Sequence, residues 1–262
     1  MAHPSFGGAA LPPLDHGFQL LYNLDFAAAH AIFADWERNH PDDPIAPTAD
    51  AAGLLFSQFE RLGVLESQFF VNDREFENRP RLSPDPAARE RFSLALDRAE
   101  RLAGARLAKN PQDRDALFAL ALSNGLEADY AALIEKRNLA SLRYTKQSTI
   151  WAEKTLAVDP GCYDAHIASG ISKYLIGSMA LPVRWLVHLG GISGDRQQGI
   201  QELTLVSERG HYLRPFADIL LAIAYVREHD KPRARQLLGG LRDQFPANPL
   251  FAREIATLDA GR

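Results

Sequence analysis

The chain has 262 residues, and 29 lysines and arginines against 33 aspartates and glutamates give it a net charge of −4 with histidine neutral. This balance argues against a nucleic-acid-binding protein, which usually shows a basic excess, and 46% hydrophobic residues are typical of a globular chain rather than a disordered one. The single cysteine, Cys162, excludes an internal disulfide and a cysteine-rich zinc site, and it leaves the compartment open between cytoplasm and periplasm.

The N-terminal segment MAHPSFGGAALPPL has neither the basic region nor the apolar core of an intact signal peptide. We expect residues 1–12 to form a flexible arm, and a periplasmic location only if a signal peptide has been removed. No run reaches the roughly 18 apolar residues that a spanning helix needs. The most apolar stretch, 174–192, is interrupted by Arg184 and His188.

From residue 17 onward, a spaced pattern of small, apolar and acidic residues recurs along the chain. Near the N-terminus it comprises Gly17, Leu20, Asp25, Ala29, Phe33 and Pro41. The same spacing returns near the C-terminus as Ala222, Tyr225, Asp230, Ala234, Leu238 and Pro246. Its second half recurs at three further places: Ala99 and Ala103 before Pro111, Ser148 and Ala152 before Pro160, and Asp195, Gly199 and Leu203 before His211.

This pattern is typical of stacked helical hairpins. Small residues let two helix backbones approach closely, and the larger apolar residue fills the space between hairpins. The acidic residue suits a helix N-cap, because its carboxylate accepts a hydrogen bond from an unpaired backbone N–H group. The proline ends the second helix because it lacks an N–H group.

These residues resemble the tetratricopeptide repeat, a helical hairpin of about 34 residues. The match is strongest over residues 10–43 and 215–248. Elsewhere the repeats are longer, and residues 115–134 and 139–158 are expected to form two long helices. We therefore expect an all-α, tetratricopeptide-like solenoid of about four to five hairpins with elongated middle repeats. Residues 1–262 would form a single domain, with a capping helix in 249–262.

Two inserts interrupt the repeats. Residues 69–86 contain charges and prolines, so they predict a loop between two helices. Residues 173–194 suggest a short extra helix after Pro182 and a glycine-rich turn. The motif Gly190–Arg196 with Gly199 resembles a region of tetratricopeptide proteins related to the inclusion body clearance family, over residues 110–255. Ile192 stands where that pattern usually has an aromatic residue. The resemblance implies a non-enzymatic role and adds no catalytic residue.

The candidate chemical sites all have simpler interpretations. The run 190–194 lacks the Lys-Ser/Thr of a phosphate loop and predicts a turn, with Asp195 and Arg196 bracing the next helix. Cys162 and His166 lie four residues apart but lack a third ligand, and residues 40–43 predict a solvated turn. Carboxylate pairs are of the generic kind found on charged helices: Glu60 and Glu66, Glu75 and Glu77, Glu127 and Asp129. We therefore predict no catalytic residue, metal site or cofactor.

Arrays of this kind bind proteins or peptides in a groove lined by the first helix of each hairpin. The register places mostly apolar residues there, unlike the Lys, Asn and Arg of domains that clamp a chaperone's C-terminal carboxylate. The predicted partner-binding residues are Phe18, Tyr22, Ile171, Tyr174, Trp185, Ile223 and Arg227. The wider groove set adds Leu14, Leu21, Asp164, Ile167, Phe216 and Ile219.

Two alternatives remain open at this point. In one, the long helices fold over the groove and bury these residues as core, which moves the binding surface toward Tyr174, Arg184 and Trp185. In the other, residues 179–187 form an interfacial wedge of a membrane-peripheral module, because Trp185 beside Arg184 suits a membrane interface. The sequence favours a non-catalytic protein- or peptide-binding scaffold over both the membrane module and a helical enzyme.

Overall fold

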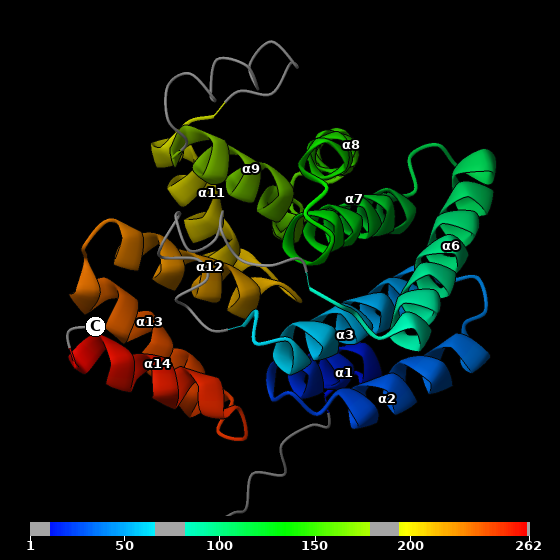
Figure 1. The fold of residues 1–262 in the computed structure, drawn as a ribbon. Coiled ribbons are helices and arrows are strands. Elements are labelled where there is room, and N and C mark those ends of the chain that lie inside the picture. Colours follow the sequence, from blue (N-terminus) through cyan, green and yellow to red (C-terminus); the bar gives the residue numbers. More distant parts are fainter. Residues whose placement is uncertain (1–10, 66–81, 179–193, 261–262) are drawn as a thin grey trace, which may run out of the picture.

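The computed structural model describes residues 11–65, 82–178 and 194–260, and every regular element within these ranges is a helix. Ten of the helices pair into five hairpins that follow one another along a curved array (Figure 1), and an eleventh helix ends the chain. The hairpins are α1 (Pro13–Tyr22) with α2 (Phe26–Asn39), α3 (Ile45–Arg61) with α6 (Pro86–Lys109), α7 (Arg114–Asp129) with α8 (Asn138–Val158), α9 (His166–Ser178) with α11 (Arg196–Arg209), and α12 (Arg214–Arg227) with α13 (Lys231–Gln244), followed by α14 (Pro249–Asp259). The predicted all-α, tetratricopeptide-like solenoid is confirmed.

Acidic N-caps begin the second helices of four hairpins, and in three of them the cap is the residue that the repeat pattern predicts, the fourth being Asp85 of α6. Asp25, Asp195 and Asp230 each accept a hydrogen bond from the backbone N–H three residues further on. Asp113 caps α7 in the same way, although the repeat pattern did not single it out. Each cap satisfies a donor that a helix N-terminus otherwise leaves unpaired.

The small residues of the pattern lie where helix backbones approach closely. A side chain at Gly199 would place its Cβ 2.5 Å from the backbone N of Tyr174 and 2.8 Å from the carbonyl O of Gly170. At Gly17, an added Cβ would collide with the buried ring of Phe33. These contacts explain why each of these two hairpins places a small residue opposite its partner helix.

The middle hairpins are elongated, as predicted. The helices α6 and α8 have 24 and 21 residues, and α7 continues into a π-helical turn over Tyr130–Ile134. The stretch Arg114–Ile134 is long and apolar enough to cross a membrane by length and composition alone. Because 61% of its most apolar window is buried inside the fold, it has the character of a core helix.

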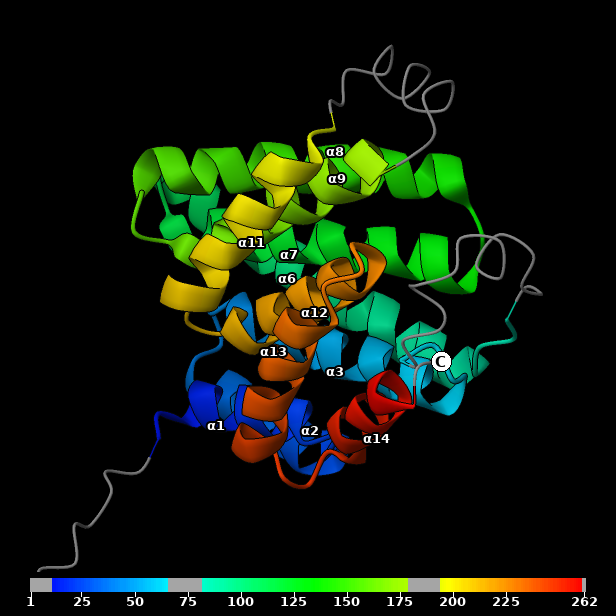
Figure 2. The same ribbon diagram turned by 90° about the vertical axis from the view of Figure 1, so that its left-hand side faces the viewer.

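The array curves far enough for its last helices to return beside its first. Figure 1 shows the array bending round from α1 and α2 to α13 and α14, and in Figure 2 α13 and α14 lie in front of α1 and α2. Tyr22 donates a hydrogen bond of 2.9 Å from its phenol to the carbonyl O of Tyr212, and its ring lies 5.2 Å from that of Phe245. Asn248 donates a hydrogen bond of 2.8 Å to the carbonyl O of Tyr22. We call these contacts between the first and last hairpins the closure.

Two expectations concern residues outside the described ranges. The loop predicted for 69–86 is described only from residue 82 onward. The short helix and glycine-rich turn predicted after Pro182 fall within 179–193.

Candidate functional site

The groove residues predicted in the first hairpin take part in the closure. Phe18 is 6% exposed, and its ring stacks on Tyr212 at 4.4 Å and meets Phe33 edge-on at 5.8 Å. Tyr22 is partly buried against Tyr212 and Phe245. A partner could reach the ring of Phe18 only by separating the first hairpin from the last.

The structure brings the residues predicted on α9 and α12 into one region. Tyr174 is 5% exposed, and its phenol donates a hydrogen bond of 3.4 Å to the carbonyl O of Ala224. Burial raises the pKa of Tyr174, and the nearby Arg227 acts against that rise. Ile171 and Ile223 keep partly exposed side chains, as does Arg227. We call the surface formed by Ile171, Ile223 and Arg227 the α9–α12 face.

Trp185 and the proposed interfacial wedge, residues 179–187, lie outside the described ranges. Of the predicted partner-binding residues, Phe18 and Tyr174 are core residues in this structure. Among the predicted partner-binding residues that the structure describes, Ile171, Ile223 and Arg227 stay partly exposed outside the closure, and they are the α9–α12 face.

A cavity that sequence reasoning missed lies where the start of α1 meets the turns between successive hairpins. It encloses about 340 Å³, and its walls come from α1, α2, α7 and the turns before α3, α9 and α12. We call it the turn cavity, and it is lined by Pro12, Leu14, Asp15, Trp36, Asp43, Ile45, Arg114, Asp115, Phe118, Gly161, Cys162, Tyr163, Asp164, Arg209, His211 and Tyr212.

Residues 40–42 form the exposed turn that the sequence predicts, whereas Asp43 is partly buried and has a structural role. Its carboxylate accepts a hydrogen bond of 2.7 Å from the indole N–H of Trp36 and another of 2.9 Å from the backbone N–H of Ile45. It therefore fixes the Trp36 side chain and the start of α3 at the same time. His40, by contrast, is exposed and stacks on Trp36 at 3.7 Å.

Asp164, predicted to face the groove, is buried and organises the turn before α12. It accepts hydrogen bonds from the backbone N–H groups of His211 at 2.8 Å, Tyr212 at 2.8 Å and Leu213 at 3.4 Å. Burial raises the pKa of this carboxyl, while the three amides favour its charged form. The geometry thus gives Asp164 a structural role.

The electrostatic environment of the turn cavity is clearest at Tyr212. The pKa of this phenol is raised to about 12, first by burial and then by the negative charges of Asp15, Asp43 and Asp115. Three carboxylates from three different elements therefore act on one aromatic side chain. Arg114 opposes them more weakly.

Cys162 also borders the turn cavity, and its thiol is buried. A guanidinium nitrogen of Arg114 lies 3.9 Å from Sγ, yet burial raises the pKa of the thiol above its ordinary value. The thiol is thus uncharged at neutral pH, unlike an activated nucleophile. Among the described residues, no group of three or more His, Cys, Asp or Glu side chains could hold a metal ion.

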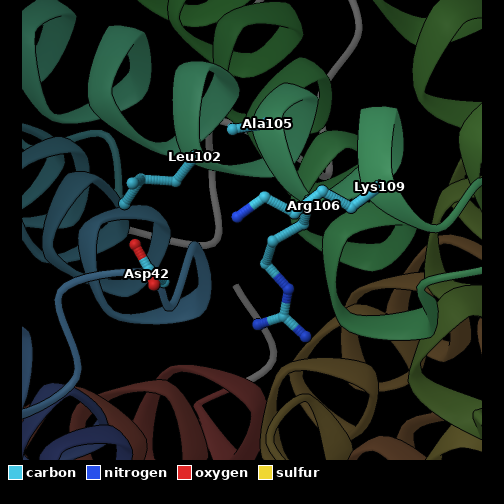
Figure 3. Close-up of a pocket in the computed structure, with 5 residues that line it drawn as sticks. All are labelled: Asp42, Leu102, Ala105, Arg106 and Lys109. Atoms are coloured by element: carbon cyan, nitrogen blue, oxygen red, sulfur yellow. The ribbon is translucent and has the colours of Figure 1, made fainter.

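A second cavity, of about 250 Å³, lies beside the end of α6 (Figure 3). Leu102, Arg106 and Lys109 line it from α6, and Asp42 faces them from the turn before α3. Arg106 is already bound by Asp113 through hydrogen bonds of 2.8 and 3.0 Å. The Arg106 guanidinium therefore joins the end of α6 to Asp113, the N-cap of α7.

The carboxylate pair Glu127 and Asp129 sits at the end of α7. Glu127 lies 3.7 Å from the guanidinium of Arg89, and burial raises the pKa of its carboxyl despite that positive charge. The pKa of Asp129 is raised to about 7 by burial. Sequence spacing alone did not distinguish this pair from others on charged helices.

No family model matches the chain, and no curated protein matches it. Among solved structures, it is similar to a thermophilic TPR protein of Thermus thermophilus. The two are 16% identical, the match covers 94% of this chain and 96% of that one, and the TM-score is 0.48. At this level the likeness carries no argument about function, and the fold assignment rests on the hairpins described above.

Proposed function

We propose that the chain is a non-catalytic scaffold that binds a protein or peptide partner through the α9–α12 face. The observation that supports this most directly is a stacked-hairpin array in which Ile171, Ile223 and Arg227 stay partly exposed while Phe18 and Tyr174 pack inside. Partly exposed apolar side chains on such an array suit a partner segment that presents apolar side chains of its own. Neither a cofactor nor a nucleic acid forms part of this proposal.

The domain arrangement is part of the same proposal. We assign residues 1–262 to a single helical-repeat domain, with α14 (Pro249–Asp259) as the cap of the array. The arm predicted for residues 1–12 falls mostly outside the described ranges, and Pro12 lines the turn cavity. Phe251 and Ile255 of α14 support the cap, because both are buried in one cluster with Leu238, Leu241 and Phe245. A terminal repeat needs such a cover, since it has no further hairpin to pack against.

The resemblance to proteins related to the inclusion body clearance family adds support over residues 110–255. Asp195 of the quoted motif caps α11, and Arg196 forms an ion pair of 3.1 Å with Glu228 at the end of α12. The motif thus braces two successive hairpins in the described region. Such a bracing role fits a scaffold and involves no catalytic step.

Affinity capture with chemical cross-linking tests the function. The variant Ile223→Glu places a charge on the α9–α12 face at a partly exposed position, so the fold should tolerate it. Leu94→Glu is the matched control, because Leu94 is 60% exposed on α6, outside that face. Both variants are first compared with the wild type by circular dichroism.

We expect the wild type and Leu94→Glu to capture the same partner and Ile223→Glu to lose it. Retention of that partner by a folded Ile223→Glu protein would place the binding surface elsewhere. A partner lost equally by both variants would show a general effect of added charge and would refute the α9–α12 face as the site.

A further inference from the structure

The outer side of α8 is a long helix surface at the edge of the array. In the described part of the chain, α8 packs on α7, on α9 and on the short helical turns beside them. Its buried residues are Ser148, Ala152 and Thr155. Figure 2 shows α8 running across the top of the molecule. Its 21 residues span roughly 30 Å at about 1.5 Å per residue.

The side chains on this outer side recur with the period of the helix. Leu139, Arg143, Lys146, Ile150 and Lys154 follow one another at intervals of four, three, four and four residues, so they lie on one side of α8. Four of them are exposed, and Ile150 is partly exposed. We call these five residues the α8 stripe.

The α8 stripe is basic, although the chain as a whole is acidic. Arg143, Lys146 and Lys154 against the single carboxylate of Glu153 give α8 a net charge of +2. The rest of the chain then carries −6, since the total is −4. A local excess of cations on an acidic protein attracts an anionic partner to this side of the molecule.

Two of these cations are not neutralised by a carboxylate. Among the residues that the structure describes, Arg143 and Lys154 form no ion pair. Each lies over an aromatic ring instead, Arg143 over Tyr144 at 5.2 Å and Lys154 over Trp151 at 4.1 Å from the ring centroid. Their charges therefore remain available to an anion from outside.

Exposed apolar side chains accompany the cations. Leu139 is 85% exposed, the highest value among the large hydrophobic residues that the structure describes. Val158, the last residue of α8, is 37% exposed. Cations and apolar side chains on one helix face, with tyrosine and tryptophan beside them, are typical of helices that lie at a membrane interface.

An acidic protein segment and an anionic bilayer both present negative charge to such a surface. A partner helix is usually held in a groove by side chains that fill pockets, and neither of the two cavities described above is lined by α8. A bilayer is flat, and it needs only cations at its headgroups and apolar side chains that enter the acyl region. The single outer helix therefore favours the bilayer.

We propose that the α8 stripe binds the surface of a membrane that contains anionic lipid. Arg143, Lys146 and Lys154 contact the phosphate headgroups, and Leu139 enters the acyl region. This inference goes beyond the proposed function and does not depend on it. Ile223 of the α9–α12 face lies on α12, so the scaffold can hold a protein partner while α8 rests on the membrane.

Co-sedimentation of the full chain with lipid vesicles tests the proposal. One vesicle is phosphatidylcholine alone, and the other contains about a third phosphatidylglycerol to supply the negative surface charge. The test variant is Arg143→Glu with Lys154→Glu. The matched control is Arg91→Glu with Arg101→Glu, two exposed positions on α6, because each pair lowers the net charge from −4 to −8. Circular dichroism first confirms that both variants fold.

We expect the wild type to bind the anionic vesicles at least about tenfold more tightly than the neutral ones, since each basic residue near an anionic surface contributes roughly fivefold. Binding should weaken at least about tenfold in the α8 variant and stay within about twofold in the α6 control, and added salt should weaken it. Leu139→Ser should weaken it about threefold, because the leucine enters the acyl region only in part.

Equal binding to the two vesicles, an equal loss in both charge variants, or no vesicle binding would each overturn the proposal. Binding of soluble poly-glutamate in place of vesicles would assign the α8 stripe to an acidic protein and also overturn it. So would vesicle binding that survives in the α8 variant and is lost in Trp185→Ala, since it would assign the contact to residues 179–187.

These outcomes are distinct from failure of the proposed function. The α8 variant keeps Ile223, so it should still capture the protein partner when it no longer binds vesicles. Vesicle binding by a protein that captures no partner would leave the α8 stripe standing and remove the scaffold.

Discussion

Replacing Gly199 by alanine should destabilise the protein, although alanine is the better helix former. The added Cβ would lie 2.5 Å from the backbone N and 2.8 Å from Cα of Tyr174, and 2.8 Å from the carbonyl O of Gly170. Because these are backbone atoms of α9, no rotamer change can remove the overlap, and α9 and α11 must move apart.

The magnitude follows from two opposing effects. Overpacking a close contact typically costs about 1–3 kcal/mol, and the backbone clash places Gly199→Ala at the upper end, near 3 kcal/mol. Alanine recovers up to about 1 kcal/mol of helix propensity. We therefore expect the free energy of unfolding to fall by about 2 kcal/mol.

Gly104 offers a control of opposite sign. It lies within α6, and an added Cβ would meet no atom within 4 Å. Gly104→Ala should therefore raise the free energy of unfolding by up to about 1 kcal/mol.

Urea unfolding followed by circular dichroism at the helix band measures both changes. Stabilisation of similar size by Gly199→Ala and Gly104→Ala would refute the close helix crossing on which the repeat assignment depends. A loss for Gly199→Ala with a gain for Gly104→Ala would agree with it.

Three further changes probe the buried polar groups. Burial raises the pKa of Asp129 from 3.8 to about 7, so the Asp129 carboxyl destabilises the fold increasingly as the pH rises from about 4 to about 7. Asp129→Asn should therefore raise the free energy of unfolding by up to about 4 kcal/mol at pH 8 and by less than about half that at pH 5. An equal gain at both pH values in urea unfolding would contradict this. Asp164→Ala leaves the backbone amides of residues 211–213 without their acceptor, so the free energy of unfolding should fall by about 2–3 kcal/mol in the same assay. A fall below about 0.5 kcal/mol would contradict the structural role of Asp164 in this turn. Tyr22→Phe removes one hydrogen bond of the closure, and thermal unfolding should show a loss of about 1 kcal/mol; an unchanged melting temperature would speak against that bond.

The repeat architecture could be predicted because its determinants are local. The N-cap aspartates of the repeat pattern, Asp25, Asp195 and Asp230, each bond a backbone group three residues away, and Gly17 and Gly199 each face the other helix of their own hairpin. Composition and spacing encode such contacts directly. For the same reason the long helices of the middle repeats could be placed, and only the π-helical turn after Asp129 departed from the expected continuous α-helix.

The closure was not predictable in the same way. It joins residues 190 positions apart at Tyr22 and Tyr212, and 226 apart at Tyr22 and Asn248. Whether the ends meet depends on small rotations accumulated over five hairpins, which no local pattern specifies. The repeat register therefore assigned Phe18 to a groove, but no local pattern shows that Tyr212, in the turn before the last hairpin, covers its ring.

The turn cavity escaped sequence reasoning for a related reason. Asp43 belongs to a turn that looks solvated when considered alone, Arg114 begins α7 directly after another turn, and Tyr212 lies in a third turn. Only the curvature of the array brings these turns to one place. Their one local signal is that aromatic residues accompany the acidic ones, as with Trp36 seven residues before Asp43.

A double-mutant cycle between Phe18 and Tyr212 tests most directly whether the array closes, which determines the surfaces that remain open to a partner. The rings stack at 4.4 Å and belong to the first hairpin and to the turn that begins the last. Unfolding of Phe18→Leu, Tyr212→Leu and the double variant should give a coupling free energy of about 1 kcal/mol, as for a stacked aromatic pair. Additivity within about 0.3 kcal/mol would contradict the closed array and return Phe18 to an open groove.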